Sequence, residues 1–273
     1  ESIMVPENYK YAINELPEMK SAIHDWYKNR YNVELTYDEM ICLQGSQEAL
    51  STLFLAMCDP GDIVLVPDPY YPIFSDGPKI AGAKVEYMPL LQENNYVIQL
   101  DQIDEEIAKK AKMMIVSYPN NPTCAIAPDS FYEELIQFAK KYDIVVLHDN
   151  AYSELVFDGK VGKSFLSFEG AKEIGIELNS FSKTYGMAGA RLGVCVGNKE
   201  VIDCYNTLKS NMDYGIFLPI QYAGIEALRH GGASIHSTCQ AYQDRRDALC
   251  EAFDEVGWHI DKGASLRRLS CKK

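Results

Sequence analysis

The sequence is short of basic residues, long apolar runs and paired cysteines, and each shortage argues against a class of protein. It has 26 lysine and arginine residues against 39 aspartate and glutamate residues, which gives a formal net charge of −13. Nucleic acid and anionic membranes both require a basic protein surface, so this balance argues against binding to either. No apolar run is long enough to span a bilayer, and the first residues do not resemble a signal peptide.

The eight cysteines form no C-x-x-C pair, and several lie inside apolar segments. This usage is typical of reduced, buried thiols and predicts a cytoplasmic protein. His24, His230, His236 and His259 show no metal-ligand spacing, so no metal site is predicted. The sequence has no internal repeat and no low-complexity tract.

The residues that are present are typical of a globular α/β protein. A chain of 273 residues with 47% hydrophobic and 24% charged residues can bury one large core or two modest ones. Apolar runs that alternate with helical periodicity predict a mostly parallel sheet with helices on both faces, an α/β/α sandwich. We expect strands at 41–43, 63–66, 83–87, 113–116, 144–147, 174–178 and 192–196, and helices at 19–30, 48–57, 100–111 (capped by Asp101), 129–142 (capped by Asp129) and, in long segments, 199–256.

Residues 179–193 hold one lysine among serines, glycines, a tyrosine and an arginine. Small residues let the backbone approach a ligand closely, and hydroxyls with the planar fork of Arg191 suit a phosphate. Lys183 can be desolvated among them, lose its proton and become an imine-forming nucleophile. A phosphate site around such a lysine suggests pyridoxal 5′-phosphate, held as a Schiff base and acting as an electron sink. The alternative is that Lys183 and Arg191 lie on a solvated loop.

Polar clusters begin where the predicted strands stop. In open parallel sheets, ligands collect beyond the carboxyl ends of the strands, so these clusters are expected to converge on one edge. Residues 45–47 join them, because a strand–glycine–helix junction presents backbone N–H groups at the positive end of a helix dipole. Ser46 can instead serve only as a helix cap, and Tyr70 and Tyr71 can pack on a helix instead of stacking on a cofactor. The clusters are 68–71, 118–123, 148–152 and 179–183.

Taken together and in order, these motifs resemble the class I/II aminotransferases, which are fold-type I pyridoxal-phosphate enzymes. The amino-acid sequence at residues 45–48, 58–62 and 148–154 most resembles the LL-diaminopimelate aminotransferase-like branch. That branch is related to the aspartate aminotransferases. The resemblance covers about residues 9–257 and implies the fold of the cofactor-binding large domain. The motifs that carry it are GSQ at 45–47, PDPYYP at 67–72, YPNNPT at 118–123, HDNAY at 148–152 and SFSK at 180–183.

The resemblance also implies a role for each matching residue. Lys183 would form the Schiff base and move the proton, and Asp149 would pair with the pyridinium nitrogen. Tyr152 and Asn121 would hydrogen-bond the phenolate oxygen of the ring. Tyr71 would stack on that ring, whereas His148 is expected to pack behind the site and not to act as a base. The phosphate would be held by Ser46, Gln47, Ser180, Ser182 and Arg191, and Tyr11 resembles a tyrosine that reaches across a dimer interface to the partner's phosphate.

The chain departs from the family pattern in three places. Cys124 stands where the family has glycine, which should strain the turn if the residue needs a positive φ. The N-terminal arm and most of the C-terminal small domain are not seen, so the substrate-carboxylate arginine has no assigned position. The expected organisation is an irregular segment at 1–17, a cofactor-binding large domain at 18–257 and an atypical tail at 258–273.

The sequence therefore predicts a pyridoxal-phosphate-dependent aminotransferase that moves an amino group from an amino acid to a 2-oxo acid. The resemblance implies a homodimer, and the short C-terminus implies a truncated form in which turnover is open. A carbon–sulfur β-lyase on the same scaffold is one alternative, distinguished by release of pyruvate and ammonia. A non-catalytic remnant that binds the cofactor is the other. The sequence does not identify the amino donor or the amino acceptor.

Overall fold

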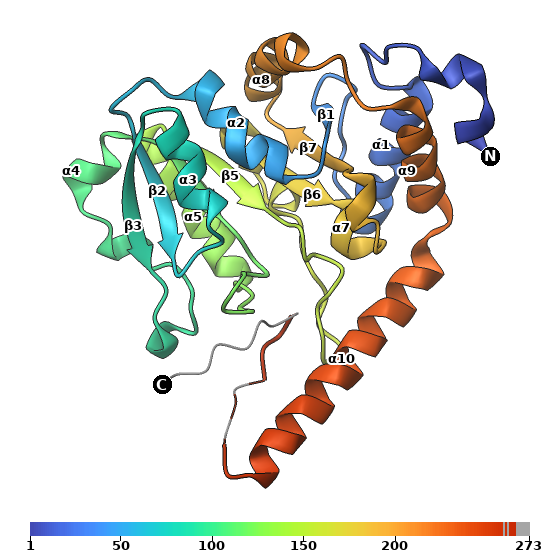
Figure 1. Cartoon of the computed structure of the whole chain (residues 1–273). Helices are drawn as coiled ribbons and strands as arrows, with labels where there is room; N and C mark the ends of the chain where they lie inside the picture. Colours follow the sequence, from blue (N-terminus) through green and yellow to red (C-terminus); the bar gives the residue numbers. More distant parts are fainter. Residues whose placement is uncertain (259, 261, 266–273) are drawn as a thin grey trace.

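The computed structural model describes residues 1–258, 260 and 262–265 (Figure 1). A seven-stranded sheet crosses the molecule in the order β1-β7-β6-β5-β4-β2-β3. Its strands are β1 (Met40–Leu43), β2 (Ile63–Asp68), β3 (Lys84–Pro89), β4 (Ala111–Val116), β5 (Val145–Asp149), β6 (Gly175–Ser180) and β7 (Gly193–Gly197).

The directions of the strands confirm a mostly parallel sheet. β2 pairs in parallel with β3 and β4, and the parallel pairing continues from β4 to β5 and from β5 to β6. β7 runs antiparallel to both of its neighbours, β6 and β1. All six strands apart from β7 therefore end at the same edge of the sheet, and β7 begins at that edge.

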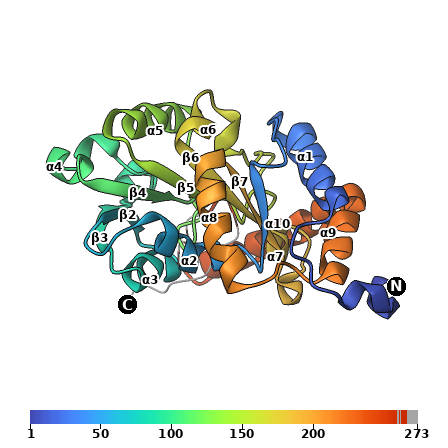
Figure 2. The same ribbon diagram turned by 90° about the horizontal axis from the view of Figure 1, so that it is seen from above.

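Helices cover both faces of the sheet, as the pattern of alternation predicts. Seen from above, α5 and α6 lie on one side, and α2, α3 and α8 lie on the other (Figure 2). The helices are α1 (Pro17–Tyr31), α2 (Gln47–Met57), α3 (Ile73–Ile80), α4 (Glu105–Ala108), α5 (Asp129–Tyr142), α6 (Ala171–Ile174), α7 (Phe181–Thr184), α8 (Lys199–Met212), α9 (Leu218–His230) and α10 (Gly232–Glu255). None of the described helices is both long and apolar enough to cross a membrane.

The hydrophobic core forms two layers, one on each face of the sheet. Successive residues of a strand point to opposite faces, so Val146 and Leu147 of β5 enter different layers. The layer of Val146 includes Leu135 of α5, whereas the layer of Leu147 includes Leu53 of α2. Burial on both faces explains why the strands read as continuous apolar runs in the sequence.

Two local expectations are wrong. The predicted helix at 100–111 is divided into a 3-10 turn, Leu100–Gln102, and the short α4, because the carboxylate of Asp104 caps α4 by accepting the backbone N–H of Glu106 at 2.9 Å. Asp129 is the first residue of α5 and not its cap, and its carboxylate pairs with Lys163 at 2.5 Å. The segment 1–17, expected to be irregular, contains the 3-10 turns Ser2–Met4 and Pro6–Tyr9.

After α10, residues 264–265 contact the loop that follows β5. The backbone N–H of Phe157 donates to the carbonyl of Ala264 at 3.0 Å, and the hydroxyl of Ser265 donates to the carbonyl of Leu155 at 2.8 Å. Arg246 of α10 forms an ion pair with Asp158 at 2.6 Å. Of the tail expected at 258–273, residues 259, 261 and 266–273 lie outside the described residues, including His259 and Cys271. The division into three segments stays a prediction.

Candidate active site

The register of the sheet brings the ends of several strands together at one edge. Asp149, the last residue of β5, lies opposite Leu178 of β6. Ser180, the last residue of β6, and Leu43, the last of β1, both lie opposite Gly193 at the start of β7. A Cβ on Gly193 would stand 2.7 Å from the backbone nitrogen of Ser46, so the absence of a side chain there lets β7 approach the start of α2.

Lys183 lies on α7, the short helix that follows β6 directly. The hydroxyl of Ser180 accepts the backbone N–H of Ser182 at 3.2 Å and so caps α7. The Lys183 ammonium lies 5.8 Å from the centre of the Tyr152 ring. Lys183 is exposed, so the described part of the chain does not supply the desolvation that the sequence suggested.

Asp149 is a buried carboxylic acid with an unused acceptor. It is 6% exposed, and its Oδ1 has no hydrogen-bond partner among the residues that the structure describes. Burial raises the pKa of Asp149 from 3.8 to about 6, while the charge of His148 and the backbone N–H of Ala151 act against that rise. A buried polar atom without a partner is costly, so this carboxyl group is suited to receive a cationic N–H donor.

Tyr152 connects the lysine to the aspartate. Burial raises the pKa of the Tyr152 phenol to about 12, the nearby charges of Asp149 and Tyr71 raise it further, and a hydrogen bond with Asn121 lowers it. Asn121 is thus a hydrogen-bond partner of Tyr152, and Asp149 and Tyr71 are close enough to act on its phenol. Because the Lys183 ammonium lies over the same ring, Lys183 and Asp149 share one site.

The two adjacent tyrosines of the 67–72 loop behave differently. The Tyr71 hydroxyl donates to Oε1 of Gln47 at 2.9 Å and so joins this loop to the first turn of α2. Tyr70 instead stacks on Tyr87, with ring centres 5.4 Å apart and an angle of 16° between the planes. Tyr71 is therefore the ring that faces the strand-end edge, and Tyr70 packs on β3.

The start of α2 forms a polar cradle with Arg191. Ser46 is the N-cap residue of α2, yet its side chain makes no capping hydrogen bond with the described residues of that helix. Arg191 donates from Nη1 to the hydroxyl of Ser182 at 3.5 Å and from Nη2 to the carbonyl of Gln44 at 3.4 Å. A Cβ at Gly45, which has φ of +77°, would meet Arg191 Nη2 at 2.3 Å. Hydroxyls, a guanidinium and a helix N-terminus together suit a phosphate.

The turn between β4 and α5 is shaped by Asn120 and Cys124. The side-chain oxygen of Asn120 accepts the hydroxyl of Thr123 at 2.9 Å, and the backbone N–H of Cys124 donates to the carbonyl of Asn120 at 2.8 Å. Cys124 has φ of +61°, the left-handed conformation that favours glycine. The turn therefore carries the strain expected for a cysteine at this position.

Tyr11 lies apart from the residues described so far. It belongs to the N-terminal segment before α1, is 78% exposed, and contacts Tyr214 with ring centres 5.2 Å apart. Its expected role concerns a second subunit and stays a prediction.

Sequence reasoning missed Glu177, a fully buried carboxylate in the middle of β6. Its oxygens accept from the Tyr27 hydroxyl at 3.0 Å, the Ser164 hydroxyl at 3.0 Å and the Phe165 backbone N–H at 2.8 Å, and they contact Nδ1 of His148 at 3.1 Å. The available signal was an acidic residue inside an apolar run at 174–178. His148 itself is buried behind the site, as expected.

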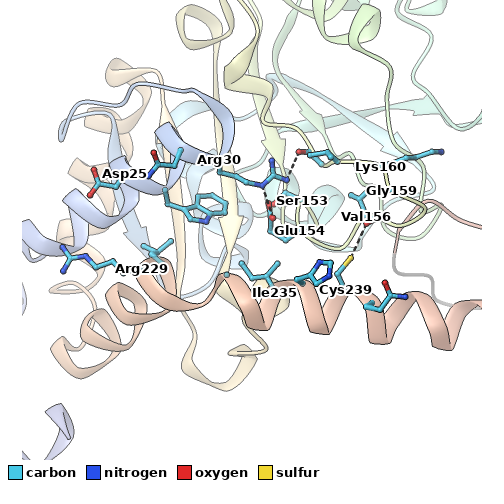
Figure 3. A pocket seen from close by; sticks show the side chains of 18 of the residues that line it. Asp25, Arg30, Ser153, Glu154, Val156, Gly159, Lys160, Arg229, Ile235 and Cys239 are labelled. Carbon is cyan, nitrogen blue, oxygen red and sulfur yellow. Dashed lines mark hydrogen bonds and ion pairs between the residues drawn. The ribbon is translucent and has the colours of Figure 1, made fainter.

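A separate cavity of about 850 Å³ lies between α1, the loop after β5 and the start of α10 (Figure 3). Arg30 and Glu154 pair across its wall at 3.1 Å, and the thiol of Cys239 donates to the carbonyl of Val156 at 3.3 Å. None of the residues expected to bind the cofactor lines this cavity. The candidate cofactor site therefore lies at the edge of the sheet, outside this cavity.

Residues 6–264 match the family model described as "Aminotransferase class I and II". The chain belongs to the class I and II aminotransferases. It is 48% identical over 262 residues to an LL-diaminopimelate aminotransferase of Halothermothrix orenii. The aligned residues cover 95% of this chain and 67% of that protein. An LL-diaminopimelate aminotransferase of Moorella thermoacetica is 44% identical over 259 residues, 94% of this chain and 66% of that protein. The chain thus spans about two thirds of the length of these curated relatives.

Solved structures of aminotransferases share this fold. The substrate-bound BacF structure from Bacillus subtilis superposes with a TM-score of 0.93 at 37% identity, covering 97% of this chain and 68% of that one. An aspartate aminotransferase double mutant of Thermus thermophilus gives 0.90 at 28% identity, with 97% and 69% covered. The predicted family and the predicted large-domain fold are confirmed.

Enzymes of this aminotransferase family depend on pyridoxal 5′-phosphate, as the resemblance predicted. The residues of this chain fit that cofactor. The unpartnered Oδ1 of Asp149 suits the N–H of a pyridinium ring, and the cradle of Ser46 and Arg191 suits a phosphate. Lys183 supplies an amine over the Tyr152 ring.

Proposed function

We propose that this chain binds pyridoxal 5′-phosphate through Lys183 and acts in an aminotransferase that passes an amino group from an amino acid to a 2-oxo acid. The observation that carries the proposal is the buried Asp149 carboxyl, whose Oδ1 lacks a partner, in one site with the Lys183 amine. A buried carboxyl group with an unpartnered oxygen is suited to pair with a cationic N–H donor, such as a protonated ring nitrogen. Because the chain spans about two thirds of its relatives, the activity of the whole protein belongs to this proposal.

The bound cofactor supplies an aldehyde that takes up amines and a ring that withdraws electrons from the reacting carbon. Asp149 would hold the ring nitrogen in its protonated form through a charge-assisted hydrogen bond. Asn121 and Tyr152 would donate to the ring oxygen, and Tyr71 would pack against the ring face. The Lys183 amine would accept a proton from the substrate carbon and return it.

The phosphate would be held by hydroxyls, backbone amides and one guanidinium at the start of α2. Arg191 contributes charge and two donors, and its contact with the Ser182 hydroxyl supports a shared role for these side chains. Ser46 and Gln47 lie at the positive end of the α2 dipole. Ser180 would act by capping α7, which fixes the helix that carries Lys183.

The names of the relatives favour LL-diaminopimelate as the amino donor. A homodimer is proposed from the exposed aromatic and aliphatic side chains of Tyr11, Ile13 and Tyr214, which are 78%, 66% and 61% exposed and offer an apolar surface to a second copy. The cytoplasmic location is supported by the thiols of Cys42 and Cys195, which lie buried in the core with their pKa values raised by burial. Sedimentation at several protein concentrations tests the dimer.

The proposal is tested with purified wild type, Lys183→Ala and a control variant, Lys110→Ala, which removes an exposed lysine outside the site. With pyridoxal 5′-phosphate added, wild type and the control should show a visible cofactor band that Lys183→Ala lacks. Addition of LL-diaminopimelate and 2-oxoglutarate should then give glutamate. A separate reaction with a cysteine thioether as the only substrate should give no pyruvate; release of a thiol, pyruvate and ammonia from it would instead indicate the β-lyase. A band that LL-diaminopimelate bleaches with no product would indicate the non-catalytic remnant. Equal, colourless spectra for wild type and Lys183→Ala would contradict the lysine assignment.

A further inference from the structure

A buried lysine joins α8 to the start of α2, and these two helices lie side by side (Figure 2). Lys209 of α8 is only 4% exposed, and its ammonium lies 2.7 Å from Oε1 of Glu48 and 2.6 Å from Oδ2 of Asp213. Glu48 belongs to the first turn of α2, whose start forms the cradle of Ser46 and Arg191. Buried ion pairs are often no more stabilising than apolar residues of the same volume, so stability alone is a poor reason for this cluster.

Glu48 connects this cluster to the loop before α2. Its Oε2 accepts the backbone N–H of Gln44 at 2.5 Å, while the Gln44 side chain donates to Oδ2 of Asp213 at 3.3 Å. The carbonyl of Gln44 in turn accepts from Nη2 of Arg191 at 3.4 Å. The contacts therefore continue without a break from Lys209, through Glu48 and Gln44, to the guanidinium of the cradle.

The backbone of residues 44–45 affects where the Arg191 guanidinium lies. Gly45 has φ of +77°, and a Cβ there would meet Nη2 of Arg191 at 2.3 Å. The guanidinium therefore packs directly on this backbone, and a shift of residues 44–45 would displace it. Because Glu48 holds the Gln44 N–H, the orientation of the Glu48 carboxylate affects the position of the cradle's cation.

The charge of Glu48 also bears on phosphate binding. Negative groups are attracted to the positive end of a helix dipole, so a carboxylate in the first turn of α2 competes with a bound phosphate. Lys209 supplies the counter-charge and holds this carboxylate against α8. Without that ammonium, the carboxylates of Glu48 and Asp213 would lose their shared cation, and Glu48 would repel a phosphate at the same turn.

We propose that Lys209 is a positioning residue for a phosphate monoester bound at the start of α2. It neutralises Glu48, and through Glu48 it fixes the backbone of residues 44–45 on which the Arg191 guanidinium rests. The identity of this phosphate as that of pyridoxal 5′-phosphate rests on the proposed function. The link from Lys209 to residues 44–45 does not.

Lys209→Met tests this role, because methionine fills a similar space and has no charge. Lys199→Met is the matched control, since Lys199 also lies on α8 and pairs with the carboxylate four residues later, Asp203, but has a side chain that is 50% exposed. The first readout is NMR hydrogen exchange of the Gln44 backbone N–H without cofactor, with the core amides of β4 as the reference for global opening. The second is the dissociation constants of pyridoxal 5′-phosphate, inorganic phosphate and pyridoxal, which lacks the phosphate.

In Lys209→Met, the Gln44 N–H should exchange about tenfold faster relative to the β4 amides, because its acceptor is no longer held. Pyridoxal 5′-phosphate and inorganic phosphate should bind about tenfold more weakly, as is typical when a residue that supports a ligand-binding group is lost, and pyridoxal should change less than about twofold. Lys199→Met should match wild type in every measurement. In Glu48→Gln/Lys209→Met no unpaired Glu48 charge remains, and glutamine can still accept the Gln44 N–H, so phosphate affinity should return to within about threefold of wild type.

Equal losses for pyridoxal 5′-phosphate and pyridoxal, or a uniform increase in exchange over β4 and Gln44, would overturn the proposal, since general loosening has no preference for the phosphate. A double variant that binds phosphate more weakly than Lys209→Met would also overturn it. If Lys209→Met does not fold, Lys209→Gln replaces it, because its amide can still donate to one carboxylate. A wild type that binds inorganic phosphate but forms no visible band with pyridoxal 5′-phosphate overturns the proposed function, while a selective loss of phosphate in the variant would still support the positioning role.

Discussion

Replacement of Asp149 by asparagine should make the cofactor-free protein more stable at neutral pH. The folded state holds this carboxyl at a pKa of about 6, whereas the ordinary value is 3.8. A raised carboxyl pKa means that the folded state binds the proton more tightly than the unfolded state does. Stability from this group is therefore full below about pH 4, declines as the pH rises towards 6, and stays low above it.

The difference of about 2 units (6 − 3.8) corresponds to about 3 kcal/mol at pH 7, at 1.36 kcal/mol per unit. Asp149 is only 6% exposed, so screening by solvent should reduce this free-energy difference little. Asparagine has nearly the same shape and no charge, so Asp149→Asn should avoid most of this cost. Its free energy of unfolding should exceed that of wild type by up to about 3 kcal/mol at pH 7 and by almost nothing at pH 4.

Urea unfolding of both proteins without cofactor, at pH 4, 5, 6 and 7, measures this difference directly. The control is Asp129→Asn on the surface, whose carboxylate pairs with the exposed Lys163 and should contribute less than about 1 kcal/mol at any pH. Saturating pyridoxal 5′-phosphate should reverse the order at pH 7, because only the aspartate can pair with the ring nitrogen. An Asp149→Asn protein that is less stable than wild type at pH 7, or a gap that is equal at pH 4 and pH 7, would refute the reasoning.

Three further substitutions test the site and the packing around it. Cys124→Gly should be about 1 kcal/mol more stable than Cys124→Ala, because both remove the buried thiol and only glycine adopts φ of +61° without strain; a lower urea midpoint for the glycine variant would contradict this. Arg191→Ala should weaken pyridoxal 5′-phosphate about 10- to 100-fold and leave pyridoxal, which lacks the phosphate, unchanged, as measured by titration calorimetry; equal losses for both ligands would exclude a phosphate contact. Gly77→Ala should cost about 1–3 kcal/mol in thermal unfolding, since its Cβ would lie 2.0 Å from the carbonyl oxygen of Leu50; unchanged stability would show that α2 and α3 separate easily.

Much of the sheet could be predicted because its strands are buried on both faces. Runs such as 113–116 and 144–147 contain no polar residue, and each is followed at once by a polar cluster. Parallel strands end at one edge, so the convergence of Lys183 and Asp149 followed from strand order without any coordinate. Glycines and hydroxyls at 179–193 indicated the cofactor type through chemistry that only a few ligands require.

Other features depend on contacts that a local pattern does not contain. The run 192–196 is apolar whichever way the strand points, so the reversed direction of β7 could not be predicted. The predicted cap is Asp101, whereas the residue that caps α4 in the structure is Asp104. Glu177 has its Tyr27 partner 150 residues away along the chain, so its burial could not be predicted from its neighbours.

The most direct test of the central claim is to locate the cofactor on the chain. Wild type is incubated with pyridoxal 5′-phosphate at a slight excess and reduced with borohydride, and the modified peptide is then identified by mass spectrometry. A single modified residue, Lys183, that is lost in Lys183→Ala and strongly reduced in Asp149→Asn, is the predicted result. Modification spread evenly over exposed lysines such as Lys110, and unchanged by either substitution, would contradict a cofactor site built from Lys183 and Asp149.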